Sequence, residues 1–207
     1  MPPMVTRDEQ RRQTRQRLYE CALAVFRRDG VNSCRTDDIA KAAGVSRGTF
    51  YFHFPTKEHV LLERMRETED QICAVIDLMP ADSPMDEVLD TLITEMAAIW
   101  EPDPQLLPDL ASAALRHVAA NMSDQESTQL RSTLSERFRG SAERGEIQVH
   151  LPAELLGDFF LGHTLGGLLA WYGNPVLPLK GVLQAVTYMF WNGAKAPTVV
   201  AATGTDA

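Results

Sequence analysis

The sequence of 207 residues contains only three cysteines, and none of them has the Cys-x-x-Cys spacing of a metal or redox site. An odd number of scattered cysteines is typical of a reducing compartment, so we expect a cytoplasmic protein without structural disulfides. A secretory leader is not expected either, because the first 17 residues hold five arginines and no long apolar block. The three cysteines are Cys21, Cys34 and Cys73.

Long hydrophobic runs and most catalytic signatures are also missing. The most apolar stretch, residues 155–172, is interrupted by Asp158, His163 and four glycines, so we expect no membrane span. The sequence has no His-Glu-x-x-His motif and no glycine-rich phosphate loop, and its five histidines do not pair with cysteines. We therefore expect no enzyme activity, no metal site and no cofactor.

The charge is unevenly distributed along the chain. The net charge is −8, which alone argues against a nucleic-acid partner. The first 60 residues, however, contain 11 Lys and Arg against 7 Asp and Glu, whereas the remainder contains 9 against 21. A basic N-terminal segment followed by an acidic remainder indicates a DNA-binding head on a domain that avoids DNA.

Residues 36–57 predict a helix, a glycine turn, a second helix and the start of a third. Gly44 lies where the chain leaves the first helix, a position that favours left-handed φ, and Ser46 is placed to cap the second helix. Thr36 is the expected N-cap of the first helix. Such a helix-turn-helix places its second helix in the DNA major groove. Apolar residues have the spacing that two crossed helices need: Ile39, Ala40, Ala43, Val45 and Phe50.

The same residues resemble the TetR family of bacterial repressors, over roughly residues 7–65. The resemblance implies that Tyr51, His53 and Lys57 contact the DNA backbone. It departs from the family at Phe52, where many relatives carry a second polar aromatic residue. The motif residues are Asp37, Ile39-Ala40, Ala43-Gly44-Val45-Ser46, Gly48-Thr49-Phe50-Tyr51-Phe52-His53-Phe54 and Lys57-Glu58.

Position within the motif suggests further DNA contacts. Arg47 and Thr49 lie near the start of the second helix, the end that meets base edges, and Arg47 is suited to guanine, to a phosphate or to solvent. Lys57 begins a helix whose N-terminus favours anions. Arg7, Arg11, Arg12, Arg15 and Arg17 precede the motif as a phosphate-binding arm or as a frayed helix start. The predicted DNA-binding set is Thr36, Arg47, Gly48, Thr49, Tyr51, Phe52, His53 and Lys57.

Apolar spacing predicts an all-α fold of about nine helices. We expect a DNA-binding domain over 1–56, a helical effector-binding and dimerisation domain over 57–195, and a disordered tail over 196–207. The fourth helix should run over 57–79 and connect the domains. Later helices are expected to end at Trp100, to cover 110–121, to begin at a capping box over 123–126, and to cover 152–172 and 179–191.

Two sets of residues in the C-terminal domain carry further expectations. Aromatic, Met and His side chains at helical spacing suit either a ligand cavity or plain core packing: Met96, Trp100, His117, Phe159, His163 and Trp171. Small residues permit close helix packing, and the resemblance implies that the last two helices pair with a second subunit. The expected dimer contacts are Gly162, Gly166, Leu183 and Met189.

These observations predict a homodimeric repressor that binds palindromic operator DNA and is released by a small molecule. A dimer also follows from physics, because one recognition helix reads only a few base pairs. An activator of the same architecture remains open. So does a helical enzyme or carrier that keeps a helix-turn-helix as scaffold, although the basic head argues against it.

Overall fold

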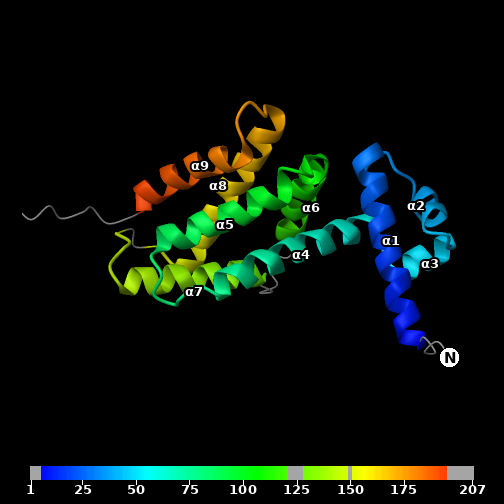
Figure 1. Cartoon of the computed structure of the whole chain (residues 1–207), viewed down its shortest axis with the longest axis horizontal. Coiled ribbons are helices and arrows are strands. Elements are labelled where there is room, and N and C mark those ends of the chain that lie inside the picture. The colour runs from blue at the N-terminus through cyan, green and yellow to red at the C-terminus, as the bar shows by residue number, and fades with distance from the viewer. Residues whose placement is uncertain (1–5, 121–127, 149–150, 195–207) are drawn as a thin grey trace, which may run out of the picture. The chain divides into compact units, whose positions relative to one another are not determined.

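The structure is a computed structural model that describes residues 6–120, 128–148 and 151–194, and these residues form nine α-helices, one 3₁₀ turn and no strand (Figure 1). The all-α prediction is therefore confirmed. The expected tail over 196–207 lies outside the described residues. The elements are α1 (Arg7–Asp29), α2 (Thr36–Ala42), α3 (Arg47–His53), α4 (Lys57–Asp77), α5 (Met85–Trp100), η1 (Pro104–Leu106), α6 (Leu107–Ala120), α7 (Gln129–Glu143), α8 (Ala153–Gly173) and α9 (Leu179–Ala194).

The chain folds as two compact units, and α4 contributes to both. The first unit comprises Met1–Thr68 and Pro102–Glu126, and the second comprises Glu69–Glu101 and Ser127–Ala207. The domain boundary expected from the sequence lies at residue 57, whereas this division also places residues 57–68 and 102–126 in the first unit. The first half of α4 and the η1–α6 segment pack with the N-terminal helices, which no local sequence pattern indicates.

Two acidic side chains attach the η1–α6 segment to α1 within the first unit. The guanidinium group of Arg27 donates hydrogen bonds of 2.8 and 2.6 Å to the two carboxylate oxygens of Asp103. Asp109 accepts a hydrogen bond of 3.1 Å from the backbone N–H of Val31, just beyond the end of α1. The bidentate pair fixes orientation as well as distance.

The helix-turn-helix forms as the sequence predicts. Gly44 has a φ of +67°, and the Ser46 hydroxyl accepts a hydrogen bond of 3.1 Å from the Thr49 N–H. Ile39 and Phe50 are fully buried, so the two short helices are held by packing rather than by their own length. One local prediction is wrong: Arg35 precedes α2 as its cap residue, and Thr36 is the first helical residue.

Of the two alternatives for the N-terminal arginines, the structure has the helix start: α1 begins at Arg7, with Thr6 as its N-cap. Thr128 caps α7, while the expected capping box over 123–126 lies outside the described residues.

The second unit is a bundle in which α8 packs against α7 and α9, and α5 packs against α9. Arg137 of α7 closes the end of α4 by donating to the carbonyl groups of Ile76 and Met79, at 2.7 and 3.0 Å. Close approach of α8 and α9 depends on Gly167, since a Cβ there would lie 3.1 Å from Val186 Cγ2 and 3.2 Å from Leu183 Cδ2. None of the described helices is long and apolar enough to cross a bilayer.

Replacing Gly167 with leucine should lower the free energy of unfolding by about 1–3 kcal/mol, because the larger side chain overpacks the α8–α9 contact. Urea denaturation monitored by circular dichroism measures this change. The double variant Gly167→Leu/Val186→Ala should recover part of the loss. A Gly167→Leu protein as stable as the wild type would contradict the close approach of these helices.

Candidate nucleic-acid interface

The recognition helix α3 is positioned by its buried aromatic residues. Phe50 and Phe54 are fully buried, with ring centroids 5.9 Å apart. Their burial leaves Arg47, Tyr51 and Phe52 exposed on the remaining surface of the helix. Helical spacing separates these exposed positions from the buried Phe50 and Phe54.

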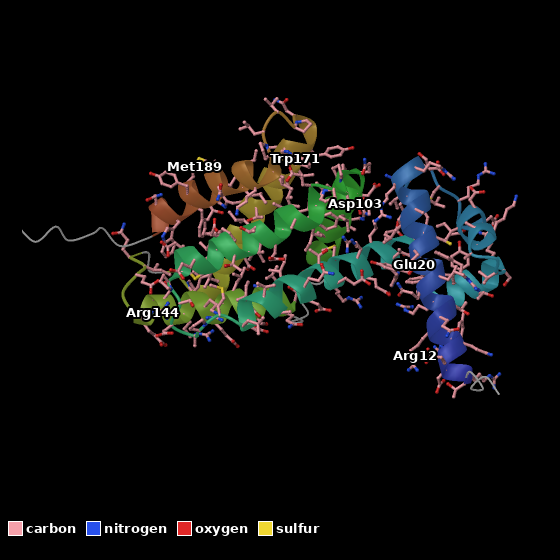
Figure 2. All side chains as sticks on the ribbon, viewed as in Figure 1. Arg12, Glu20, Asp103, Arg144, Trp171 and Met189 are labelled. Carbon is pink, nitrogen blue, oxygen red and sulfur yellow. The ribbon has the colours of Figure 1, made fainter. Side chains whose placement is uncertain are left out.

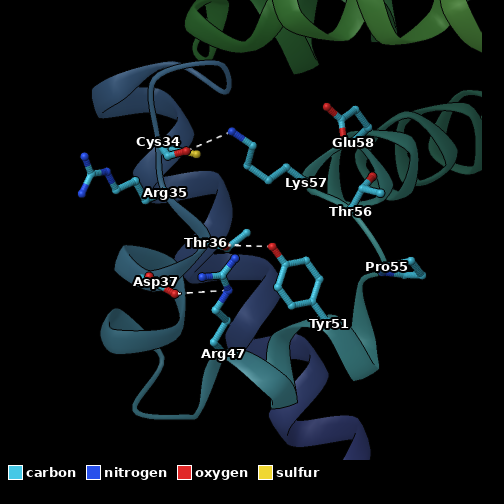
Figure 3. Close-up of a pocket in the computed structure, with 10 residues that line it drawn as sticks. All are labelled: Cys34, Arg35, Thr36, Asp37, Arg47, Tyr51, Pro55, Thr56, Lys57 and Glu58. Atoms are coloured by element: carbon cyan, nitrogen blue, oxygen red, sulfur yellow. Dashed lines mark hydrogen bonds and ion pairs between the residues drawn. The ribbon is translucent and has the colours of Figure 1, made fainter.

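A cavity of about 420 Å³ lies where α2, α3 and the start of α4 meet, and Thr36, Arg47, Tyr51 and Lys57 are among its lining residues (Figure 3). We call it the lysine pocket. The Tyr51 hydroxyl lies 3.1 Å from the Thr36 hydroxyl. Hydrogen bonds from Thr36 and Arg47 lower the pKa of Tyr51. The pocket thus brings together hydroxyl, guanidinium and ammonium donors, which is the chemistry that phosphate oxygens require.

Arg47 is folded back over this pocket. Its Nε atom lies 3.5 Å from Asp37 Oδ1, and its guanidinium carbon lies 5.5 Å from the centroid of the Tyr51 ring. The ion pair is well exposed on both sides and therefore weak. Arg47 can leave Asp37 at little cost when a base or a phosphate is offered.

Lys57 has a structural task that the sequence did not reveal. Its ammonium group donates a hydrogen bond of 2.6 Å to the Val31 carbonyl. It donates another, of 2.9 Å, to the Cys34 carbonyl (Figure 3). An ammonium group has three donors, so one remains for a phosphate. The partners are backbone atoms more than twenty residues away, and no side-chain motif signals such a contact. Burial raises the pKa of the Cys34 thiol beside it, which disfavours the reactive thiolate.

Arg15 fastens the other end of α3. One of its nitrogens donates a hydrogen bond of 2.6 Å to the His53 carbonyl, and another pairs with Glu63 of α4. Its guanidinium carbon also lies 4.3 Å from the centroid of the Phe54 ring. Burial, and then the charges of Arg15 and Arg11, lower the pKa of His53, which favours its neutral form.

Residues 44–48 read Gly-Val-Ser-Arg-Gly, the letters of a nucleophile elbow. The Ser46 hydroxyl nevertheless bonds to the N–H and the hydroxyl of Thr49, at 3.1 and 2.9 Å, and it caps a helix that follows another helix. This is the geometry of a helix cap and not of a serine activated by histidine. Within the described ranges, no three His, Cys, Asp or Glu side chains gather closely enough to hold a metal ion.

The residues expected at a ligand cavity divide into two groups. Met96, Trp100 and Trp171 are buried in the second unit, and the Trp171 indole donates a hydrogen bond of 2.9 Å to the Leu177 carbonyl. Phe159 and His163 are exposed on the outside of α8, so their assignment to an interior cavity is wrong. The side chain of His117 lies outside the described part of the chain.

The residues expected at a dimer interface also divide into exposed and buried ones. Gly162 and Gly166 face open space, and the side chain of Met189 is 67% exposed, so all three are available to a second molecule. Leu183 is fully buried, beside Gly167, and its assignment to the interface is corrected to the core of the subunit. Both α8 and α9 are rich in small and apolar residues on several sides, which conceals their inward faces in the sequence.

Comparison with known proteins identifies the first unit. Residues 18–63 match the family model of bacterial regulatory proteins, tetR family. The chain is therefore similar to this family over residues 18–63. It is 39% identical over 64 residues to the HTH-type transcriptional regulator AcrR of Shigella flexneri, a match that covers 31% of this chain and 30% of AcrR. The chain thus spans less than a third of the length of this curated relative.

Solved structures share the fold over nearly the whole chain. The repressor FadR of Thermus thermophilus, in complex with lauroyl-CoA, is 24% identical with a TM-score of 0.67, covering 92% of this chain and 100% of FadR. The SmeT–triclosan complex is 18% identical with a TM-score of 0.66, and the match covers 94% of this chain and 98% of SmeT. At these identities the likeness concerns the fold.

Replacing Lys57 with methionine should lower the free energy of unfolding by about 1–3 kcal/mol, because two partly buried carbonyl groups lose their charged donor. The matched control is Lys41→Met, which removes the same charge from an exposed position on α2 and should change stability little. Chemical denaturation compares the two variants. Equal stabilities would show that the Lys57 contacts contribute nothing to the fold.

Proposed function

We propose that the protein is a homodimeric transcriptional repressor that binds palindromic operator DNA and is released by a small molecule. The observation that carries this proposal is the lysine pocket, which gathers phosphate-type donors beside an exposed recognition helix. In this proposal, Lys57, Tyr51 and His53 bind the DNA backbone, and Arg47 and Thr49 face the bases. Gly48 allows the backbone of α3 to approach the groove closely.

The case for a dimer rests on the surface of α8 and α9. One exposed face of α8 and one of α9 contain no Asp, Glu, Lys or Arg, and the exposed Glu154 lies at the start of α8, outside that face. An uncharged face of this kind on a protein of net charge −8 favours burial against a second copy. The two faces consist of Phe159, Gly162, His163, Gly166, Leu169 and Ala170 on α8, and of Gly181, Gln184, Ala185, Tyr188 and Met189 on α9.

The second unit is the proposed effector-binding part. FadR and SmeT bind lauroyl-CoA and triclosan, respectively, which are ligands with large apolar parts. Met96, Trp100 and Trp171 supply buried, polarisable and aromatic surface in the corresponding unit of this chain. An effector with an apolar body fits such surroundings.

The proposed mechanism is a shift between two states. In the DNA-binding state, the two recognition helices of the dimer lie about one turn of DNA apart, roughly 34 Å. The effector binds better to a state in which the two heads have another spacing. Its effect on DNA affinity is limited by its differential affinity for the two states.

Selection from a random-sequence duplex library, followed by a gel-shift assay, tests the DNA-binding function. We expect an inverted repeat and a steep dependence of affinity on salt, because several phosphates are neutralised at once. Wild-type protein that returns no enriched sequence would overturn the proposal. Sedimentation at the same protein concentration tests the dimer separately.

Replacing Arg47 with alanine should relax base preference at one symmetric position, at a cost of about 1–3 kcal/mol per half-site. The reason is the place of Arg47 at the start of α3, where its exposed side chain is held only by a weak ion pair. Repeating the selection with the variant measures this effect. Identical preferences for variant and wild type would exclude a base contact.

Replacing Gly162 with leucine should weaken the dimer and abolish operator binding while the monomer stays folded. A Cβ at this position meets no atom of the same chain, so the steric effect arises only against a second copy. Overpacking costs about 1–3 kcal/mol per site, and a two-fold interface contains the substitution twice. Analytical ultracentrifugation measures the dissociation constant of the dimer. A constant equal to that of the wild type would contradict the assignment of Gly162 to the interface.

A further inference from the structure

A second pocket, of about 450 Å³, lies between the end of α3 and the first turns of α1. Figure 2 shows Arg12 on this part of α1. The pocket lies wholly within the first unit, and we call it the arginine pocket. Its lining residues are Asp8, Arg11, Arg12, Arg15, Phe52 and His53.

The three arginines of this pocket have different partners. Arg15 is engaged by the His53 carbonyl and Glu63, and Arg12 forms an ion pair of 2.6 Å with Glu9. Arg11 has no carboxylate partner among the residues that the structure describes. Its guanidinium carbon lies 5.0 Å from the centroid of the Phe52 ring. Arg11 is thus a cation held in place without being neutralised.

Phe52 provides the support for this arginine. The Phe52 side chain is 65% exposed on the recognition helix. A phenyl ring has no N–H or O–H group with which to hydrogen-bond to DNA. A guanidinium group stacks on an aromatic face without using its N–H donors, so all five remain free for an anion. Phe52 therefore acts as a platform that orients Arg11.

The geometry of the major groove indicates what the anion is. A helix lying in this groove, which is about 12 Å wide, has one sugar–phosphate strand on each side. Tyr51 and Arg47 line the lysine pocket, whereas Phe52 and His53 line the arginine pocket. Adjacent residues of a helix point about 100° apart, so the two pockets open on different sides of α3.

We propose that Arg11, seated on the ring of Phe52, binds a backbone phosphate of the strand across the major groove from the strand bound at the lysine pocket. This inference rests on the proposed DNA-binding function and extends it to α1. Asp8 is the one carboxylate that lines the pocket, and the three guanidinium groups outnumber it. The lowered pKa of His53, caused in part by Arg15 and Arg11, is consistent with a positive potential there.

The decisive comparison is between Arg11→Ala and Arg17→Ala. Both variants remove one exposed arginine from α1, so their net charge is the same, but Arg17 does not line the arginine pocket. Affinity is measured at several salt concentrations for the duplex selected with the wild-type protein and for a mixed-sequence duplex. Each lost phosphate contact lowers the log–log salt slope by about 0.9, so Arg11→Ala should lower it by about 1.8 in a dimer.

The platform is tested by Phe52→Ala and Phe52→Tyr. The alanine variant should lower the salt slope as Arg11→Ala does, whereas tyrosine keeps the ring and should preserve the slope. Ethylation interference then locates the phosphate. An ethyl group that inhibits wild-type binding, but not binding of Arg11→Ala, should lie on the strand across the groove.

Two outcomes overturn different claims. Wild-type protein that selects no duplex contradicts the proposed function and this site with it. Wild-type protein that selects a duplex, while Arg11→Ala and Arg17→Ala show the same slope, contradicts the Arg11 site alone. A salt slope that is lowered by Arg11→Ala and by Phe52→Ala, but not by Arg17→Ala, supports the Arg11 site.

Discussion

The proposed DNA-binding face depends on how the short loop from Val31 to Cys34 is held. Lys57 binds two of its carbonyl groups, and Asp109 binds the N–H of Val31, so both edges of this backbone segment meet a charged side chain. Charged partners make such hydrogen bonds stronger than neutral ones. The loop in turn fixes where α2 begins, which places Thr36 beside Tyr51. Lys57 therefore both lines the lysine pocket and holds the loop on which the shape of this pocket depends.

The recognition helix is held near both of its ends by hydrogen bonds. The Ser46 hydroxyl accepts from the Thr49 N–H at its start, and Arg15 joins its last carbonyl group, that of His53, to Glu63 of α4. A helix of seven residues is not stable alone, so these contacts and the burial of Phe50 replace the missing length. The basic character of the N-terminal residues thus has two parts: some cations build the head, and others remain available to DNA.

Much of this arrangement was predictable from the sequence, for reasons that are local. Gly44, Ser46 and the apolar spacing of α2 and α3 encode the turn, because φ, capping and burial act over a few residues. The early start of α1 was only one of two alternatives in the sequence, since residues 7–17 are all polar and lack the apolar spacing that marks a buried helix face. The faces of α8 were also hidden. Only the packing against α9 separates Gly167, which is inside, from Gly166, which is outside.

The discontinuous first unit has a consequence for engineered chimeras. Regulators with new inputs are made by joining one head to the effector part of another protein, and the start of α4 is the obvious place to cut. In this chain such a cut would leave Asp103 and Asp109 with the discarded part, while Arg27 and the Val31 N–H remain in the transplanted head without their carboxylates. A transplant that includes residues 102–126, or a recipient with acidic residues at the corresponding places, keeps the head intact.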